Sequence, residues 1–190
     1  MFVPLRRLLK RSPRAGDVRE LRGKFRAAMA KDGEQAEADE VLARKLALAA
    51  AYGEVSSCAT CAKGKPGERG AYAGGDCCSG GALVVFSDEE VAALAQTGTR
   101  PSDLEPAHGP ARDPGCAFRG PTGCTLEVAH RPAVCVRYAC QILQRELHRS
   151  GRHDIEQLAR ELGAALDRFT AARAEREQRE AGEALLRSLA

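Results

Sequence analysis

Apolar residues near the start of the chain recur at the spacing of an α-helix. The first stripe places its members at i, i+3, i+7 and i+11 on one helical face: Val18, Leu21, Phe25 and Met29. A second stripe predicts a helix that ends before Gly53. Its members are Val41, Leu42, Lys45, Leu46 and Ala49. The Lys31-Asp32-Gly33 sequence between the stripes predicts a break, so we expect two helices that cover a core.

The last third of the chain carries the same signal. Pro132 suits the first turn of a helix, and the pattern predicts a helix over residues 133–149 that stops at Gly151. Asp154 is a candidate N-cap for a last helix over 154–188, whose apolar face comprises Ile155, Leu158, Leu162, Leu166 and Phe169. The end of that helix is rich in Ala, Arg and Glu, which predicts a solvated helix with a candidate docking tip of Leu185, Leu186 and Leu189.

The central part of the chain has a different pattern. Residues 82–86 form a short apolar run that is typical of a strand. Ser87 and Glu90 follow as a capping-box pair, which predicts a short helix over 88–97. A second strand or turn pair is expected around Phe118 and residues 125–128.

These elements predict an α+β fold that is mostly helical. We expect a small, irregular, cysteine-rich, metal-bound core flanked by N- and C-terminal helices. Four segments follow from the pattern: a basic flexible N-terminus (1–16), a helical extension (17–55), a cysteine-cluster metal-binding domain (56–150) and a C-terminal helix (151–190).

Composition narrows the classes of function. The 29 Lys and Arg nearly balance the 26 Asp and Glu, so there is no strong signal for nucleic-acid binding. No run of about 18 apolar residues is present, so no membrane span is predicted. Basic residues interrupt the N-terminus where a secretory signal needs an unbroken apolar stretch. The predicted compartment is therefore the cytoplasm, where thiols stay reduced.

The cysteines are the unusual feature of the composition. All eight lie between residues 58 and 140, in the stretch richest in Gly and Pro. A region poor in large apolar residues needs other bonds to become ordered, and clustered cytosolic cysteines favour metal over disulfides. The predicted metal ligands are Cys58, Cys61, Cys77, Cys78, Cys116, Cys124, Cys135 and Cys140.

The spacing of these cysteines bears on how they are grouped. A C-x-x-C pair begins at Cys58, and a tight turn can bring such a pair to one ion. Cys77 and Cys78 are neighbours, so in an extended segment they point in opposite directions unless the backbone kinks. Cys135 and Cys140 lie about 140° apart around a continuous helix, so either the helix begins after Cys135 or the two serve different centres. An interleaved pair of centres is the simplest hypothesis.

Part of the cluster resembles a known family. Gly-Cys-Thr-Leu at 123–126, Arg-Pro-Ala-Val-Cys at 131–135 and Tyr-Ala-Cys at 138–140 are similar to the C-terminal signature of the YkgJ-like cysteine-cluster proteins. Those proteins are described as zinc- or iron-chelating domains, and the similarity covers about residues 58–140. Two departures are visible: fifteen residues separate Cys61 from Cys77, and Val136 stands where the family usually has arginine. The resemblance implies that the cluster chelates a metal.

Thiolate ligands fit zinc, iron or an iron–sulfur cluster, in one or two centres. We predict a cytosolic metal-binding protein whose metal is mainly structural, with a surface for a protein partner. One alternative is an iron–sulfur or iron-dependent enzyme, or an accessory factor of a protein-modifying system. The other alternative is a disulfide-stapled protein.

Other residues in the cluster region have weaker signals. His130 is a candidate substitute ligand, and Glu127 is the nearest candidate acid for a catalytic metal. No nucleotide-binding loop and no H-E-x-x-H motif is present in the sequence, so no catalytic residue is assigned. Six basic residues can offset thiolate charge by hydrogen bonding to sulfur: Lys63, Lys65, Arg69, Arg119, Arg131 and Arg137.

Overall fold

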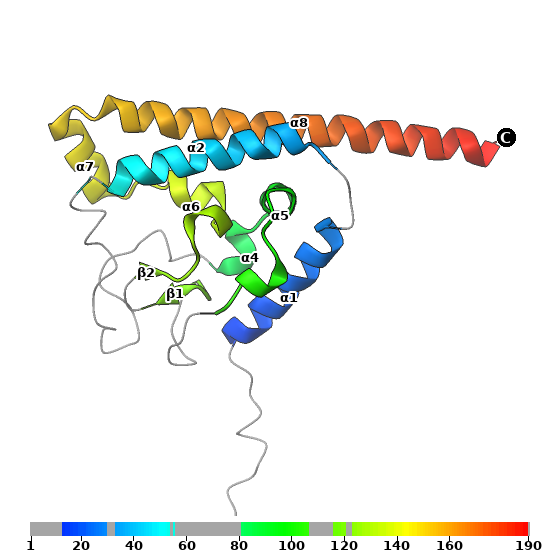
Figure 1. Ribbon diagram of the computed structural model, residues 1–190, viewed down its shortest axis with the longest axis horizontal. Helices are drawn as coiled ribbons and strands as arrows, with labels where there is room; N and C mark the ends of the chain where they lie inside the picture. The colour runs from blue at the N-terminus through cyan, green and yellow to red at the C-terminus, as the bar shows by residue number, and fades with distance from the viewer. Residues whose placement is uncertain are drawn as a thin grey trace, which may run out of the picture.

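The computed structural model describes residues 13–29, 33–53, 55, 81–106, 116–120 and 123–189. Most of these residues are helical (Figure 1). The α-helices are α1 (Pro13–Met29), α2 (Gln35–Gly53), α4 (Ala82–Val85), α5 (Asp88–Gln96), α6 (Ala133–Arg137), α7 (Gln141–Ser150) and α8 (His153–Leu189). Two 3-10 turns, η3 (Pro101–Asp103) and η4 (Val128–His130), and two short strands, β1 (Arg119–Gly120) and β2 (Gly123–Cys124), complete the described elements.

The two long helices α2 and α8 pack side by side in opposite directions (Figure 1). Arg44 of α2 bonds Glu161 of α8 at 2.6 Å, and Arg168 of α8 bonds Glu40 of α2 at 2.8 Å. The later residue of α8 pairs with the earlier residue of α2, so these ion pairs fix the antiparallel register of the two helices. Both pairs are partly exposed, so the apolar surface between the helices contributes most of the stability.

A first apolar cluster lies between this pair and the short helices beneath it. Helices α2, α6, α7 and α8 all contribute to it. Its most buried members, each at most 1% exposed, are Ala38, Leu48, Ala133, Ile155, Leu162, Ala165 and Phe169. Most of the predicted stripes of the second and last helices therefore face one shared core. Leu46 is an exception at 45% exposed, and Leu48, which lies outside the predicted stripe, is buried instead.

A second apolar cluster joins α1 to α4, α5 and the strand pair. The ring of Phe86 lies between two other aromatic rings, with centroids 6.2 Å from Phe25 and 5.7 Å from Phe118. All three side chains are at most 1% exposed. These edge-on and tilted contacts connect α1 to the strand pair through the end of α4.

Helix α5 connects the two clusters. Its residues 90–95 are all buried, with Ala92 and Ala93 in the first cluster and Val91 and Leu94 in the second. A helix that is buried all round is a core helix rather than an amphipathic cover. The predicted start of this helix is confirmed at Ser87, whose side chain accepts a hydrogen bond from the Glu90 amide at 3.3 Å.

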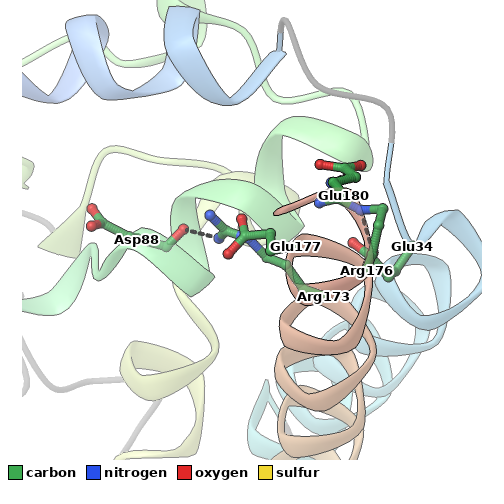
Figure 2. A network of polar contacts seen from close by, with 6 residues as sticks. All are labelled: Glu34, Asp88, Arg173, Arg176, Glu177 and Glu180. Carbon is green, nitrogen blue, oxygen red and sulfur yellow. Dashed lines mark hydrogen bonds and ion pairs between the residues drawn. The ribbon is translucent and has the colours of Figure 1, made fainter. Parts of the chain in front are cut away.

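Arginine side chains tie the far half of α8 to two other helices (Figure 2). Arg176 donates to the carboxylate of Glu34, just before α2, at 2.7 Å and to Glu180 at 2.8 Å. One turn earlier, Arg173 donates to the backbone carbonyl of Asp88, the first residue of α5, at 3.0 Å. These contacts hold α8 against the N-terminal ends of α2 and α5.

Beyond these contacts, α8 projects past the rest of the molecule (Figure 1). Residues 178–189 are exposed, including the three apolar side chains Leu185, Leu186 and Leu189. The solvated end of the last helix is therefore confirmed, and a docking role for its tip stays a prediction. No helix in the described part of the chain combines the length and apolar character needed to cross a membrane.

The predicted α+β fold class is wrong, because most of the described residues are helical and very few are in strands. Their strand content is limited to the antiparallel β1–β2 pair, two residues on each side. The predicted strand over 82–86 is instead the single-turn helix α4. Ala82 and Phe86 are buried while Val84 is 78% exposed, which is the burial pattern of a helical turn rather than of an alternating strand.

The predicted continuous helix over 133–149 is also wrong. Helix α6 ends at Arg137, residues 138–140 are not helical, and α7 begins at Gln141. The break allows two short helices of different direction to contribute to the first apolar cluster, with Val136 from α6 and Leu143 and Leu147 from α7.

Candidate functional site

Two of the predicted ligands lie in or just before the strand pair. Cys124 is in β2 and pairs with Arg119 of β1, while the carbonyl of Cys116 accepts the Arg119 amide at 3.1 Å. Cys116 is 8% exposed, and Cys124 is partly buried against the second apolar cluster. A further bond from the Thr125 amide to the Phe118 carbonyl, at 2.9 Å, closes the turn. The strand pair thus places Cys116 and Cys124, which are close in the sequence, on neighbouring segments of the chain.

The other two described ligands lie at the break between α6 and α7. Cys135 is in the middle of α6, and Cys140 is the N-cap of α7, with an extended backbone at φ −68° and ψ 166°. Because the chain is not helical between them, the separation of about 140° expected for one helix does not apply. The geometry therefore permits Cys135 and Cys140 to serve one centre, and this pair does not itself indicate two centres.

The remaining predicted ligands, Cys58, Cys61, Cys77 and Cys78, lie outside the described residues. Within residues 13–29, 33–53, 55, 81–106, 116–120 and 123–189, no group of three or more His, Cys, Asp or Glu side chains is arranged to hold a metal ion. The donor chemistry of the four described cysteines fits zinc or iron, since thiolate is a preferred ligand of both.

A buried lysine binds the backbone between the two pairs of described cysteines. Lys45 of α2 is 1% exposed, and its Nζ donates to the carbonyl of Ala129 at 2.7 Å and to that of Arg131 at 3.0 Å. These two carbonyls belong to η4 and to the residue that follows it. Lys45 occupies the centre of the buried stripe of α2, where an apolar residue is the rule.

A buried carboxylate binds the next residues of the same segment. Glu90 of α5 is 4% exposed; its Oε2 accepts the amide of Ala133 at 2.8 Å and its Oε1 accepts that of Val134 at 2.9 Å. These are the first amides of α6, whose N-cap is Pro132 and has no side chain that could bind them. Glu90 therefore caps a helix that begins 43 positions further along the chain.

Burial affects the protonation of both groups. Burial lowers the pKa of Lys45 to about 8, and the Glu90 carboxylate raises it in part. Burial likewise raises the pKa of Glu90, which the hydrogen bonds from Ala133 and Val134 and the charges of Lys45 and Arg137 lower in part. The two opposite charges thus offset each other's desolvation.

Arginines complete the surroundings of this segment. Arg131 donates through Nε to the carbonyl of Leu126 at 2.8 Å, which closes the turn that contains η4. The guanidinium of Arg137 lies over Gly163 of α8, where a Cβ would lie 3.0 Å from its Cζ. Arg119 is 2% exposed. Of the other basic residues named as sulfur donors, Lys63, Lys65 and Arg69 lie outside the described residues.

The candidate substitute ligand and the candidate acid lie beside the same turn. His130 has its Nδ1 3.0 Å from the hydroxyl of the buried Thr99. Glu127 is exposed and lines an open pocket of about 390 Å³ together with His130, Asp103 and Glu105. Their roles as ligand and acid stay predictions.

Sequence reasoning missed the roles of Lys45 and Glu90. Lys45 was placed on the apolar stripe of its helix, and a charged residue in the middle of such a stripe was the available signal. Glu90 was assigned to a capping box, but its carboxylate caps α6 rather than its own helix. Nothing in the local sequence around residue 90 indicates a partner so far along the chain.

Compared with protein-family models, with curated proteins and with solved structures, the chain matches none. The resemblance to the YkgJ-like proteins therefore stays a prediction that rests on the residues quoted for it.

Proposed function

We propose that this protein binds zinc or iron through its cysteine cluster, and that the metal is mainly structural. The observation that carries the proposal is the confinement of all eight cysteines to residues 58–140. The long helices α1, α2 and α8 contain none of them. A random distribution would have scattered cysteines over these helices as well.

The surroundings of the described cysteines also support a structural role for the metal. Cys116 and Cys124 border a strand pair of two residues on each side, and Cys135 lies in a helix of five residues. Elements this short are not stable on their own in water, so they need packing or bonds from elsewhere. Bound metal supplies such bonds, because the unfolded chain has no preformed site.

The proposal also includes a compartment and a grouping of ligands. A reducing cytoplasm keeps the thiols available for metal, and a protein partner would use the exposed surface of the cluster or the tip of α8. Cys77 and Cys78 give one thiolate to each of two centres, since neighbours in an extended segment point apart.

Elemental analysis of the chain purified without oxygen tests the proposal. We expect at least one zinc or iron per chain, and loss of at least about half of that metal in the double variant Cys135→Ser with Cys140→Ser. The matched control is the double variant Thr97→Ser with Thr125→Ser, which keeps both hydroxyl groups and removes no thiol. Less than about half a metal per chain, together with eight reactive thiols, would contradict the proposal.

Colour separates the metals. A brown protein with visible absorption indicates an iron–sulfur centre, whereas a colourless protein with bound zinc indicates a tetrahedral thiolate site.

A further inference from the structure

Lys45 and Glu90 are two buried opposite charges that bind consecutive parts of one backbone segment. Lys45 binds the carbonyls of Ala129 and Arg131, and Glu90 binds the amides of Ala133 and Val134. The two side chains come from different helices, α2 and α5, so they hold residues 129–134 from two sides of the core.

Stability alone is a weak reason for such a pair. Removing two charges from water is costly for each ion, and apolar replacements of buried pairs are often neutral or stabilising. Here each charged side chain instead forms hydrogen bonds with backbone groups that an apolar side chain could not satisfy. The pair therefore selects one conformation of the 129–134 segment.

This segment ends one residue before a predicted metal ligand. The amide of Cys135 donates to the carbonyl of Pro132 at 3.1 Å, so the position of Cys135 follows that of the segment. Helix α6 has five residues, too few to keep its own direction in solution. The capping of its first amides by Glu90 fixes where α6 begins.

The opposite end of the segment follows Cys124. Arg131 donates to the Leu126 carbonyl at 2.8 Å, and His130 lies 3.0 Å from Thr99. Lys45 binds the carbonyls on both sides of His130, which closes the turn from the side of α2. The chain between the two cysteines is thus fixed by contacts that involve no thiol.

We propose that Lys45 and Glu90 are positioning residues for the metal centre: they hold residues 129–134 so that Cys135 is in place before metal binds. The inference rests on the proposed function, because it concerns the same site. It adds that the affinity for metal depends on two residues that donate no ligand. For residues that orient ligands, such a dependence is on the order of 10-fold to 100-fold in affinity.

The test uses the full chain, reduced and without oxygen, with cobalt(II) alone as the probe. Cobalt bound by thiolates absorbs in the near ultraviolet and the visible, so a titration against a chelator of known affinity gives the dissociation constant. We expect Glu90→Gln to weaken cobalt binding by 10-fold or more, since an amide group places a donor against one of the two backbone amides. The matched control is Glu89→Gln, the neighbouring residue on α5, which we expect to bind within twofold of the unmodified chain.

A double variant, Lys45→Met with Glu90→Gln, guards against a general loss of folding. It leaves no unpaired buried charge, so we expect the helical circular dichroism of the metal-free chain to be retained. Weak cobalt binding by this folded double variant supports the proposal. Binding equal to that of the unmodified chain overturns the inference and leaves the proposed function intact.

Two further outcomes are decisive. Loss of helicity in both variants would show that the pair holds the whole fold rather than this segment, and would overturn the inference. Failure of the unmodified chain to bind cobalt, zinc or iron would instead overturn the proposed function and the inference with it.

Discussion

Arg176 and Glu34, 142 positions apart in the sequence, are joined by a hydrogen-bonded ion pair of 2.7 Å (Figure 2). Their side chains are 17% and 8% exposed, which makes this pair far less exposed than the pairs along the middle of α2 and α8. Because burial raises the energy of an isolated charge, each member depends on the other.

Replacing Arg176 with Met should lower the free energy of unfolding by about 1–3 kcal/mol, since it leaves the Glu34 carboxylate without its partner. The exposed Arg179 lies one turn further along α8, and Arg179→Met should change stability by less than about 0.5 kcal/mol. Urea titration of the two variants measures the difference. Equal effects would show that the exposed and the buried arginine are equivalent.

The same pair predicts a loss of stability in acid. Burial raises the pKa of the Glu34 carboxyl, but the Arg176 guanidinium, together with hydrogen bonds from the backbone and from Gln96, outweighs burial, so this pKa lies below its usual value of 4.5. A carboxyl with a depressed folded pKa contributes stability above its unfolded pKa, and that stability is lost as the pH falls through the folded value. The difference in free energy of unfolding between the unmodified chain and Glu34→Gln should therefore be constant near pH 7 and should shrink towards zero below about pH 4. A difference that stays constant to pH 3 would contradict this reading.

Lys45 predicts a pH dependence of the same sense, but at high pH. Its folded pKa of about 8 lies below the usual 10.5, so the unfolded chain binds more protons between these values. Stability should therefore rise with pH in that range, by about 1 kcal/mol per pH unit relative to a Lys45→Met variant. The two proteins share every other titratable group, so the comparison removes the contribution of those groups. Parallel stability curves from pH 8 to 10 would show that Lys45 is not desolvated.

Arg137 and Gly163 predict the effect of adding one methyl group to α8. Alanine in place of an interior helical glycine stabilises by about 1 kcal/mol where space permits. Nothing lies within 4 Å of a Cβ at Gly23 of α1, so Gly23→Ala should show the full gain. At Gly163 the added Cβ lies 3.0 Å from the Arg137 guanidinium, which must move, so the gain of Gly163→Ala should be smaller.

A double-mutant cycle tests the cause of that difference. Removing the guanidinium with Arg137→Met should restore the full gain of Gly163→Ala, because the three heavy atoms nearest to that Cβ all belong to the Arg137 guanidinium. Thermal or urea unfolding of the four proteins measures the coupling. A gain at Gly163 equal to that at Gly23 in the presence of Arg137 would contradict the predicted contact.

Much of the helical framework was predictable because its signals are local. The stripe that contains Leu21 and Phe25 predicts α1, and the stripe that contains Leu162 and Phe169 predicts α8. Gly98 and Gly151 have φ of 93° and 65°, and they follow α5 and α7 as helix-ending glycines commonly do. These features depend on neighbours within a few residues.

The failures were at positions that depend on distant partners. Residues 82–86 satisfy the composition of a strand, but the packing of Phe86 against Phe25 and Phe118 favours a helical turn that buries it together with Ala82. The role of Glu90 depends on Ala133, which the local sequence does not reveal. Asp154 was expected to cap the last helix; it lies one residue inside α8 and is bonded by Arg152 at 2.8 Å.

The candidate site was predictable in part for the same reason. Clustering and spacing predict the candidate ligands, the family resemblance predicts their chemistry, and both stay predictions. Their grouping depended on whether the chain is helical between Cys135 and Cys140, and no Gly or Pro marks the break there. The buried Lys45 and Glu90 act on backbone atoms, which carry no sequence signature.

The doublet predicts how many centres the cluster contains. If Cys77 and Cys78 serve two centres, replacing both with Ser should damage both centres, whereas Cys61→Ser should damage one. Metal content measured without oxygen should then fall to near zero in the double variant and to about half in the single one.

Since structural thiolate sites contribute folding free energy, both variants should melt at a lower temperature, the double variant more so. Circular dichroism should retain most of its helical signal, because α2 and α8 are held together by their own apolar contacts. Full metal content and an unchanged melting temperature in the double variant would show that the doublet is a pair of ordinary thiols and that the two-centre arrangement is wrong.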